Sequence, residues 1–205
     1  MNALRTRLRA ASENDRGFSL IEVIVAMVIL GILTTAALGL YITSIQSAAT
    51  LQRREIAVTV ASQAMESVAA TPVAALYGGR SKAAVTAQWA SNATASGLSQ
   101  TVLNWDKSAT LPVIVAVPLT RLVSLSGTDF AVTTLIGTCY QRAAGPGAGG
   151  DCGVVSSPAT SFTALERVMV VVTWTAGDAC AGGSCRYETT TLIDSHADQQ
   201  WKSGA

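Results

Sequence analysis

The sequence predicts an α+β protein in which a long N-terminal helix packs on an antiparallel β-sheet domain. Three observations lead to this fold class: a long uncharged segment near the start, a helical period of apolar residues that continues after it, and β-rich stretches in the remainder. With 205 residues, of which 49% are apolar and 13% charged, the chain can bury one core and is not a disordered polymer.

Charge is distributed unevenly at the start of the chain. Residues 1–17 carry four arginines against two acidic residues, whereas residues 18–52 contain Glu22 as their single charged side chain. The 20 uncharged residues from Val23 to Ile42 match the ~20 that a membrane-spanning helix needs. The basic flank predicts that residues 1–17 stay cytoplasmic and that the remainder is exported. An ordinary cleaved signal peptide does not fit, because its apolar stretch spans only ~7–15 residues.

Glu22 lies only four residues inside the apolar segment. An ionised carboxylate costs ~2.5–3.5 kcal/mol at the centre of a membrane and less near the interface. A residue of this kind indicates a function, and it needs either a cationic partner or a position among the lipid headgroups.

The segment 16–27 reads Arg-Gly-Phe-Ser-Leu-Ile-Glu-Val-Ile-Val-Ala-Met, and it resembles the prepilin signature of type IV pilins and type II secretion pseudopilins. The specific resemblance spans roughly residues 16–45, and the remainder is similar to the family only in its architecture. Within the family the chain looks most similar to the PilV-like minor pilins.

The resemblance implies that a prepilin peptidase removes the leader 1–17 by cutting between Gly17 and Phe18. It also implies that Phe18 is then N-methylated and that the whole apolar helix is retained. Glu22 matches the family's acidic position, which implies a salt bridge with the new amine on Phe18 of a neighbouring subunit. The alternative is a Glu22 side chain that reaches the headgroups.

The helical period continues beyond the uncharged run, through Ile42, Ile45, Ala49, Ile56, Val60, Ala64 and Val68. This spacing predicts an amphipathic helix, and Thr71-Pro72 is expected to end it. The helix would span residues 18–70, about 80 Å, with 18–42 in the membrane or the filament core and the remainder on the domain. Gly39 lies where major pilins usually carry Pro, so a kink at this point is left open.

Residues 71–205 are expected to form the exported, β-rich domain, although 71–97 shows no clear period. Five strands are predicted, at Thr101–Trp105, Leu111–Val117, Phe130–Arg142, Arg167–Thr175 and Tyr187–Ile193. The last two would form a hairpin around Gly177–Ser184.

All four cysteines lie in the exported part. Because that compartment is oxidising, we expect disulfides, with sequential pairing of Cys139 with Cys152 and of Cys180 with Cys185 as the natural choice. A zinc site is the alternative, but neither spacing has the usual short knuckle on both sides.

Other function classes find little support in the composition. A net charge of +1 gives no field that would gather nucleic acid, and one His excludes a multi-His metal site. There is no hydrolase, Walker, zincin or EF-hand motif, so we expect neither an enzyme nor a cofactor. His196 is interpreted as a solvated tail residue, and the four tryptophans as core or rim residues.

The sequence therefore predicts a minor pilin of a type IV pilus, which is first a single-pass membrane protein and later a cell-surface subunit. Its expected partners are other pilins, the prepilin peptidase and the inner-membrane assembly machinery. A type II secretion or DNA-uptake pseudopilin is the alternative within the family. A membrane-tethered binding domain that never joins a filament is the alternative of another class. Nucleic-acid binding and the role of the filament stay open.

Overall fold

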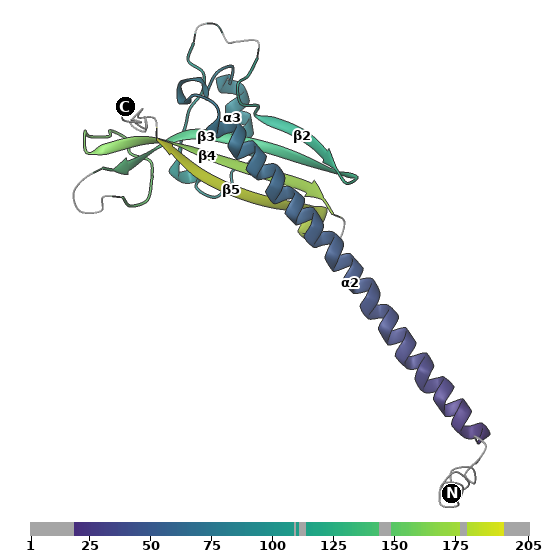
Figure 1. Cartoon of the computed structure of the whole chain (residues 1–205). Coiled ribbons are helices and arrows are strands. Elements are labelled where there is room, and N and C mark those ends of the chain that lie inside the picture. Colours follow the sequence, from purple (N-terminus) through teal and green to yellow (C-terminus); the bar gives the residue numbers. More distant parts are fainter. Residues whose placement is uncertain (1–18, 109, 111–113, 144–148, 177–179, 195–205) are drawn as a thin grey trace, which may run out of the picture. The chain divides into compact units, whose positions relative to one another are not determined.

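The computed structural model describes residues 19–108, 110, 114–143, 149–176 and 180–194 (Figure 1). It forms two compact units, residues 1–49 and 50–205, and each is described by itself. The helices are α2 (Leu20–Ala69) and α3 (Lys82–Ser91), with short 3-10 turns at Val73–Ala75, Leu98–Gln100 and Ala181–Gly183. The strands are β1 (Val102–Leu103), β2 (Thr120–Leu125), β3 (Thr128–Arg142), β4 (Phe162–Thr175) and β5 (Ser184–Asp194).

The five strands form one antiparallel sheet with β3 and β4 at its centre. β5 pairs along β4, while β2 and β1 pair with successive parts of β3 on its other side. A long helix followed by this sheet confirms the predicted α+β class, with a pilin-like arrangement.

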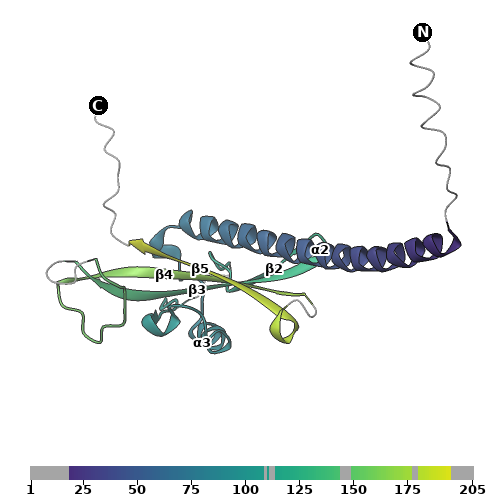
Figure 2. The same ribbon diagram turned by 90° about the horizontal axis from the view of Figure 1, so that it is seen from below.

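The sheet is covered on both faces within residues 50–205, and Figure 2 shows α3 and the C-terminal part of α2 on opposite sides of it. On one face, a stripe of small residues from α2 contacts the apolar side chains of β3 and β4. This stripe consists of Ala57, Val60, Ala61, Ala64 and Val68, and it packs with Phe130, Val132, Ile136, Val168, Val170, Val172 and Trp174. The second face carries a smaller cluster of Ala95, Leu98, Leu135, Met169 and Val171, with Trp89 of α3 against it.

The end of α2 agrees with the predicted stop, because the helix closes at Ala69 and Thr71-Pro72 follows directly. The segment 71–97, to which the sequence assigned no period, contains α3. Its N-cap is Ser81, whose hydroxyl accepts a 3.3 Å hydrogen bond from the Ala84 backbone N–H. This helix is short and alanine-rich, so its apolar side chains do not form a readable period.

Three predicted strands are present and longer than expected. β3 begins two residues before Phe130, β4 begins five residues before Arg167, and β5 extends from Ser184 to Asp194. The hairpin that joins β4 to β5 is also present, because Thr175 pairs with Ser184.

Two other predicted strands were wrong in extent or position, and one strand was not predicted. Of the predicted strand Thr101–Trp105, only the two residues of β1 pair with the sheet. Of the strand predicted at Leu111–Val117, residues 114–117 do not form a strand. Pro118 follows this second segment and has no N–H to donate, and the carbonyl of Val117 bonds to a buried arginine instead. β2 was missed altogether.

Candidate functional site: the exposed apolar helix

The first part of α2 is apolar on all sides, and its side chains are exposed among the described residues. Every residue from Ser19 to Ala48 is exposed, and large side chains such as Leu20, Met27 and Leu40 are 79%, 68% and 73% exposed. Among the described residues, α2 is the one helix that is long and apolar enough to cross a membrane. Exposure of so many apolar side chains requires a lipid or protein environment outside this chain.

Threonine hydroxyls in this part of the helix donate hydrogen bonds to the preceding turn. The hydroxyl of Thr35 donates to Gly31 O at 3.1 Å, and that of Thr43 donates to Gly39 O at 3.0 Å. Such bonds to the preceding turn let hydroxyl groups lie in an apolar medium. α2 continues through Gly39 without a break, so the helix is not interrupted at the position where major pilins usually carry Pro.

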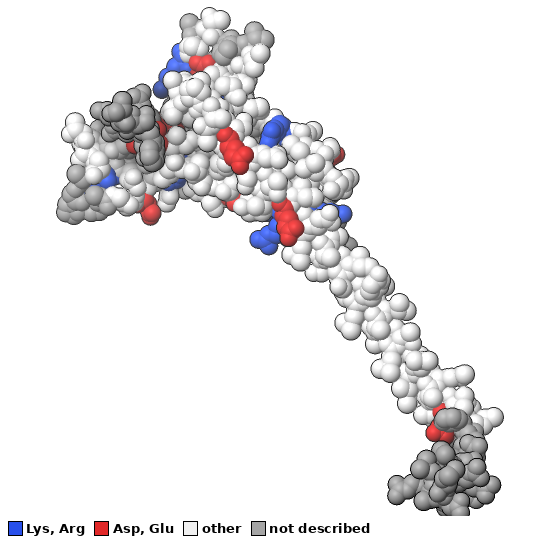
Figure 3. Space-filling model, viewed as in Figure 1, with Lys and Arg blue, Asp and Glu red and all other residues white. Residues whose placement is uncertain are grey.

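Glu22 lies in the first turn of α2, where its backbone N–H donates to Ser19 O at 2.9 Å. Figure 3 shows the apolar part of the helix as a white surface with acidic atoms at its start. Among the described residues Glu22 makes no ion pair, so any cationic partner must come from elsewhere. Gly17 and Phe18, the predicted cleavage and methylation residues, lie outside the described residues.

The two expected disulfides are present in the domain. Cys139 on β3 is joined to Cys152 across 5.4 Å between Cα atoms, and both residues are buried against Leu165. Cys180 is joined to Cys185 across 5.2 Å and closes the β4–β5 hairpin. In the part of the chain that the structure describes, no group of three metal-ligating side chains gathers. His196 lies outside that part.

A buried arginine, which no sequence pattern indicated, holds the segment before β2. Arg80 is fully buried and donates to Val117 O at 3.1 Å and to Thr134 O at 2.7 Å. Burial lowers the pKa of its guanidinium to about 10. Because its partners are carbonyl groups and the Gln88 amide, it acts as a structural anchor for the domain.

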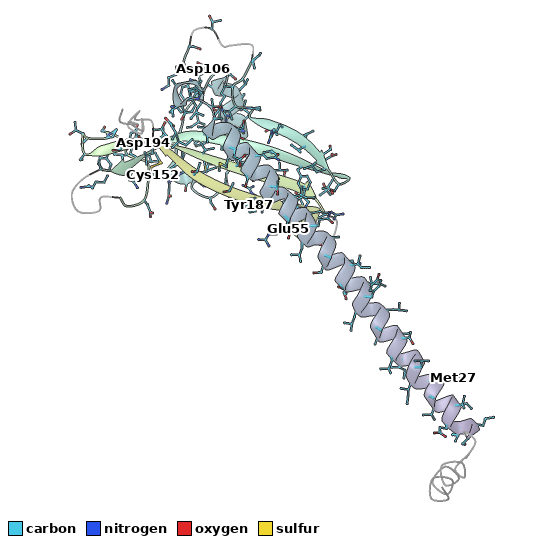
Figure 4. All side chains as sticks on the ribbon, viewed as in Figure 1. Met27, Glu55, Asp106, Cys152, Tyr187 and Asp194 are labelled. Atoms are coloured by element: carbon cyan, nitrogen blue, oxygen red, sulfur yellow. A yellow bond between two sulfur atoms is a disulfide. The ribbon has the colours of Figure 1, made fainter. Side chains whose placement is uncertain are left out.

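A second anchor joins the segment after α2 to the sheet. Tyr77 donates its hydroxyl hydrogen bond to the Glu166 carboxylate on β4, close to Thr138 on β3. Burial and this bond both raise the pKa of Tyr77 above its ordinary value. Figure 4 shows Met27 on the apolar part of α2 and Glu55 on its later part.

Two of the tryptophans occupy the expected core or rim positions. Trp174 is buried and packs against Phe130 with 5.8 Å between ring centroids, and Trp89 flanks the second cluster. The Lys82 Nζ atom lies 4.7 Å from the centroid of the half-buried Trp105 ring. None of these contacts creates a catalytic constellation, and the exposed helix remains the feature of the molecule that demands a function.

A comparison with protein families gives a match at the N-terminus. The prokaryotic N-terminal methylation motif matches residues 13–38, which include Gly17, Phe18 and Glu22 together with residues 19–38 of the exposed apolar run. No significant match was found among curated proteins or among solved structures. The match covers 26 of the 205 residues, so it shows a prepilin-type N-terminal motif ahead of the pilin-like α+β arrangement.

Proposed function

We propose that this chain is a minor pilin, made as a membrane-inserted prepilin and then assembled into, or priming, a type IV pilus. The observation that carries the proposal is the coincidence of the methylation motif at 13–38 with an apolar helix whose side chains are exposed among the described residues. In the membrane, lipid would cover this helix; in a filament, the helices of other subunits would replace the lipid. The role is structural rather than catalytic.

Maturation would begin at the leader. A prepilin peptidase would cut between Gly17 and Phe18, and Phe18 would then be N-methylated. Gly17 has no side chain, so the backbone of the scissile bond is accessible on the leader side. The cut would create an α-amine, which is cationic near neutral pH because its ordinary pKa is about 8.

Glu22 would supply the counter-charge during assembly. Its carboxylate lies one helical turn inside the apolar segment and has no cationic partner among the described residues. A buried carboxylate without a partner costs several kcal/mol, and the amine of a neighbouring subunit's Phe18 would remove that cost. The pair would favour addition of a subunit at a defined axial position, since only one offset between helices brings the two groups together.

A type II secretion or DNA-uptake pseudopilin is the second candidate. It would share the motif, the leader cleavage and the exposed helix, and it would differ in the machinery that extends the filament. A membrane-tethered binding domain is the third candidate. It would need the apolar helix as an anchor but would need neither the Gly17 cut nor Glu22.

Leader removal is the first test. The chain is co-expressed with a prepilin peptidase and its intact mass is measured. The proposal expects the loss of residues 1–17 and the gain of one methyl group. The Gly17→Leu variant should keep its leader, because a bulky side chain blocks the scissile bond. If Gly17→Leu is still processed at this position, the assignment is wrong.

Assembly is the second test, with Glu22→Gln as the variant and Glu55→Gln, an exposed position later on α2, as the matched control. Both variants should be exported and lose the leader, because neither change affects the cut. The fraction of Glu22→Gln in sheared filaments should fall, since the amine of the neighbour is left unpaired in an apolar bundle at a cost of ~3–5 kcal/mol. Equal filament-to-membrane ratios for wild type and Glu22→Gln on an immunoblot would reject the intersubunit pair and favour headgroup contact.

A further inference from the structure

The sheet has two edges that carry no further strand among the described residues. β5 pairs only with β4, and β2 pairs only with β3. Figures 1 and 2 show the two strands at opposite edges of the sheet. Unpaired N–H and C=O groups on such edges can pair with a strand from another chain.

Each edge also presents an exposed leucine on the same face of the sheet. Leu122 on β2 is 76% exposed and pairs with Ala131 on β3. Leu192 on β5 is 41% exposed and pairs with Arg167 on β4, which in turn pairs with Gly137 on β3. Ala131 and Gly137 are six residues apart on β3, an even number, so their side-chain positions face the same way. This is the face that carries α3.

Leu192 stands beside a cleft of about 520 Å³ between β5 and the segment that follows α3. The lining residues are Ser96, Gly97, Gln100, Arg167, Thr190, Thr191 and Leu192. The guanidinium of Arg167 is already bonded to Gly97 O at 2.8 Å and to Cys152 O at 2.6 Å, so the cleft does not need an anion. It has room for an apolar side chain that enters from the β5 edge.

Strand direction decides which second copy can supply that side chain. Directions alternate from β2 through β3 and β4 to β5, because each pair is antiparallel. β5 of one copy and β2 of a second copy are therefore antiparallel when both copies have the same orientation. Two β5 strands can pair antiparallel only if one copy is reversed, and such a pair closes on itself instead of continuing the sheet. The proposed function calls for a contact that repeats between like-oriented subunits, and in this step the inference rests on that function.

We propose that β5 of one copy pairs with β2 of a second copy and that the sheet continues between like-oriented subunits. Leu122 of the second copy would stand opposite Leu192 and enter the cleft. In this register all six residues of β2 lie opposite residues 189–194. Compared with a second copy that is shifted only sideways, across the strands, this copy is also displaced by six residues along the strands, about 20 Å. This contact is head-to-tail, so it can repeat along a growing assembly.

Paired cysteines test the contact in the full-length chain, purified in detergent from cells that also express a prepilin peptidase. The proposed register places Ser124 directly opposite Thr190, so the double variant Ser124→Cys with Thr190→Cys should cross-link under mild oxidation. Cross-strand neighbours lie within disulfide distance, and the described native cysteines are all bonded already. Because each copy offers one cysteine at each edge, a non-reducing gel should show a ladder of dimers, trimers and larger species.

The controls separate the alternatives. Thr190→Cys alone should give little dimer; if it gives as much as the double variant and no ladder forms, a reversed β5–β5 pair replaces the proposed contact. Thr120→Cys with Thr190→Cys places the two positions four residues out of register, about 13 Å apart, and should not cross-link. Adding Leu122→Asp to the cross-linking variant should lower the amount of cross-linked species about tenfold, because a charge replaces the apolar side chain that enters the cleft.

The intact mass of the same samples reports leader removal, so the two proposals fail separately. A processed chain that forms no ladder overturns the sheet contact and leaves the pilin function standing. A ladder from an unprocessed chain supports the contact and counts against the pilin function.

Discussion

The two halves of α2 have the same backbone conformation but opposite surroundings. From Leu20 to Ala48 every side chain is exposed, whereas in the second half Ala57, Val60, Ala61, Ala64 and Val68 form a buried stripe. The first half is apolar on all sides, and the second half alternates small apolar residues with exposed residues such as Gln63 and Glu66. Burial, not helix formation, separates the two halves: the second half packs against the sheet, and the first half has no apolar partner among the described residues.

This difference also explains the choice of side chains. The buried stripe uses Ala and Val, which let the helix lie close to the sheet. The exposed half uses Leu, Ile and Met, which present a large apolar surface to lipid or to other helices. A substitution that unfolds the domain when it is made in the buried half should therefore leave the domain folded when it is made in the exposed half.

The largest expected effect comes from introducing a charge into each half. Val60 is fully buried, so Val60→Asp places an unpaired carboxylate in the core and should cost more than about 4 kcal/mol, enough to unfold the domain. Val28→Asp changes a residue that is 57% exposed and touches no core, so the domain should remain folded in detergent. Near-UV circular dichroism of the detergent-solubilised chain measures both.

Membrane insertion should be affected more by Val28→Asp than by Val60→Asp. Val28→Asp adds a carboxylate to the membrane segment, at ~2.5–3.5 kcal/mol near its centre, and should reduce insertion. Val60→Asp should insert normally, because its position lies beyond the apolar run. If both variants unfold the domain, the exposed half has a structural partner in the chain and the comparison is wrong.

The disulfides test the same difference in the domain, because both lie outside the exposed helix. The bond between Cys139 and Cys152 closes a loop with a sequence separation of 13, and the bond between Cys180 and Cys185 closes one of 5. In the chain-entropy model their removal costs about 3 and about 2 kcal/mol. Paired Cys→Ala variants should therefore lower the free energy of unfolding in that order, as measured by urea titration. Insertion of the helix should not change, and an equal loss from both variants would contradict the loop argument.

The helix and the strong strands could be predicted from the sequence because each carries a period. The stop at Thr71-Pro72 placed the end of α2 within one residue, and the apolar runs of β3, β4 and β5 located the centre of the sheet. β2 was missed because its six residues mix exposed and half-buried positions at an edge. The Ser126-Gly127 pair that follows is a turn signal and could have revealed it.

The anchors of the domain could not be predicted from any local pattern. Arg80 bonds to carbonyl oxygens that are 37 and 54 residues away, and Tyr77 bonds to Glu166 at a separation of 89. Only the folded arrangement brings these groups together. Of the proposed assembly site, the motif in the sequence supplied Gly17, Phe18 and Glu22, while the proposed contact between sheets depends on the sheet order, which no local pattern gives.

An alkaline titration tests how the segment after α2 is fixed to the sheet. Burial, and next the hydrogen bond to Glu166, raise the pKa of Tyr77. The unfolded chain ionises this phenol near pH 10, so the stability it contributes is complete below that pH and falls as the pH rises further. Relative to Tyr77→Phe, the wild-type chain should lose up to about 1.4 kcal/mol per pH unit above pH 10.

Arg80 acts in the opposite direction, because burial lowers its pKa to about 10 in the folded state; since the charge of Tyr77 also acts on this pKa, the Arg80 contribution cancels only in part between wild type and Tyr77→Phe. Unfolding by urea from about pH 9 to about pH 11.5 measures the difference. Parallel pH profiles for wild type and Tyr77→Phe would show that the Tyr77–Glu166 bond does not hold this junction.

The smallest expected effect lies in the turn that precedes β3, far from the exposed helix. Ser126 and Gly127 form a two-residue hairpin loop, with Leu125 paired to Thr128, and both have positive φ, 51° and 72°. This geometry fits a type I′ turn, in which Asn is preferred at the first position because it tolerates left-handed backbone better than Ser. Ser126→Asn should therefore stabilise the domain by a few tenths of a kcal/mol, a rise in Tm of about 1 °C. Gly127→Ala should destabilise it by about 1 kcal/mol, because a Cβ is strained at this φ. Thermal unfolding followed by circular dichroism measures both, and a Tm that falls in Ser126→Asn would show that β2 is held by its pairing with β3 rather than by its turn.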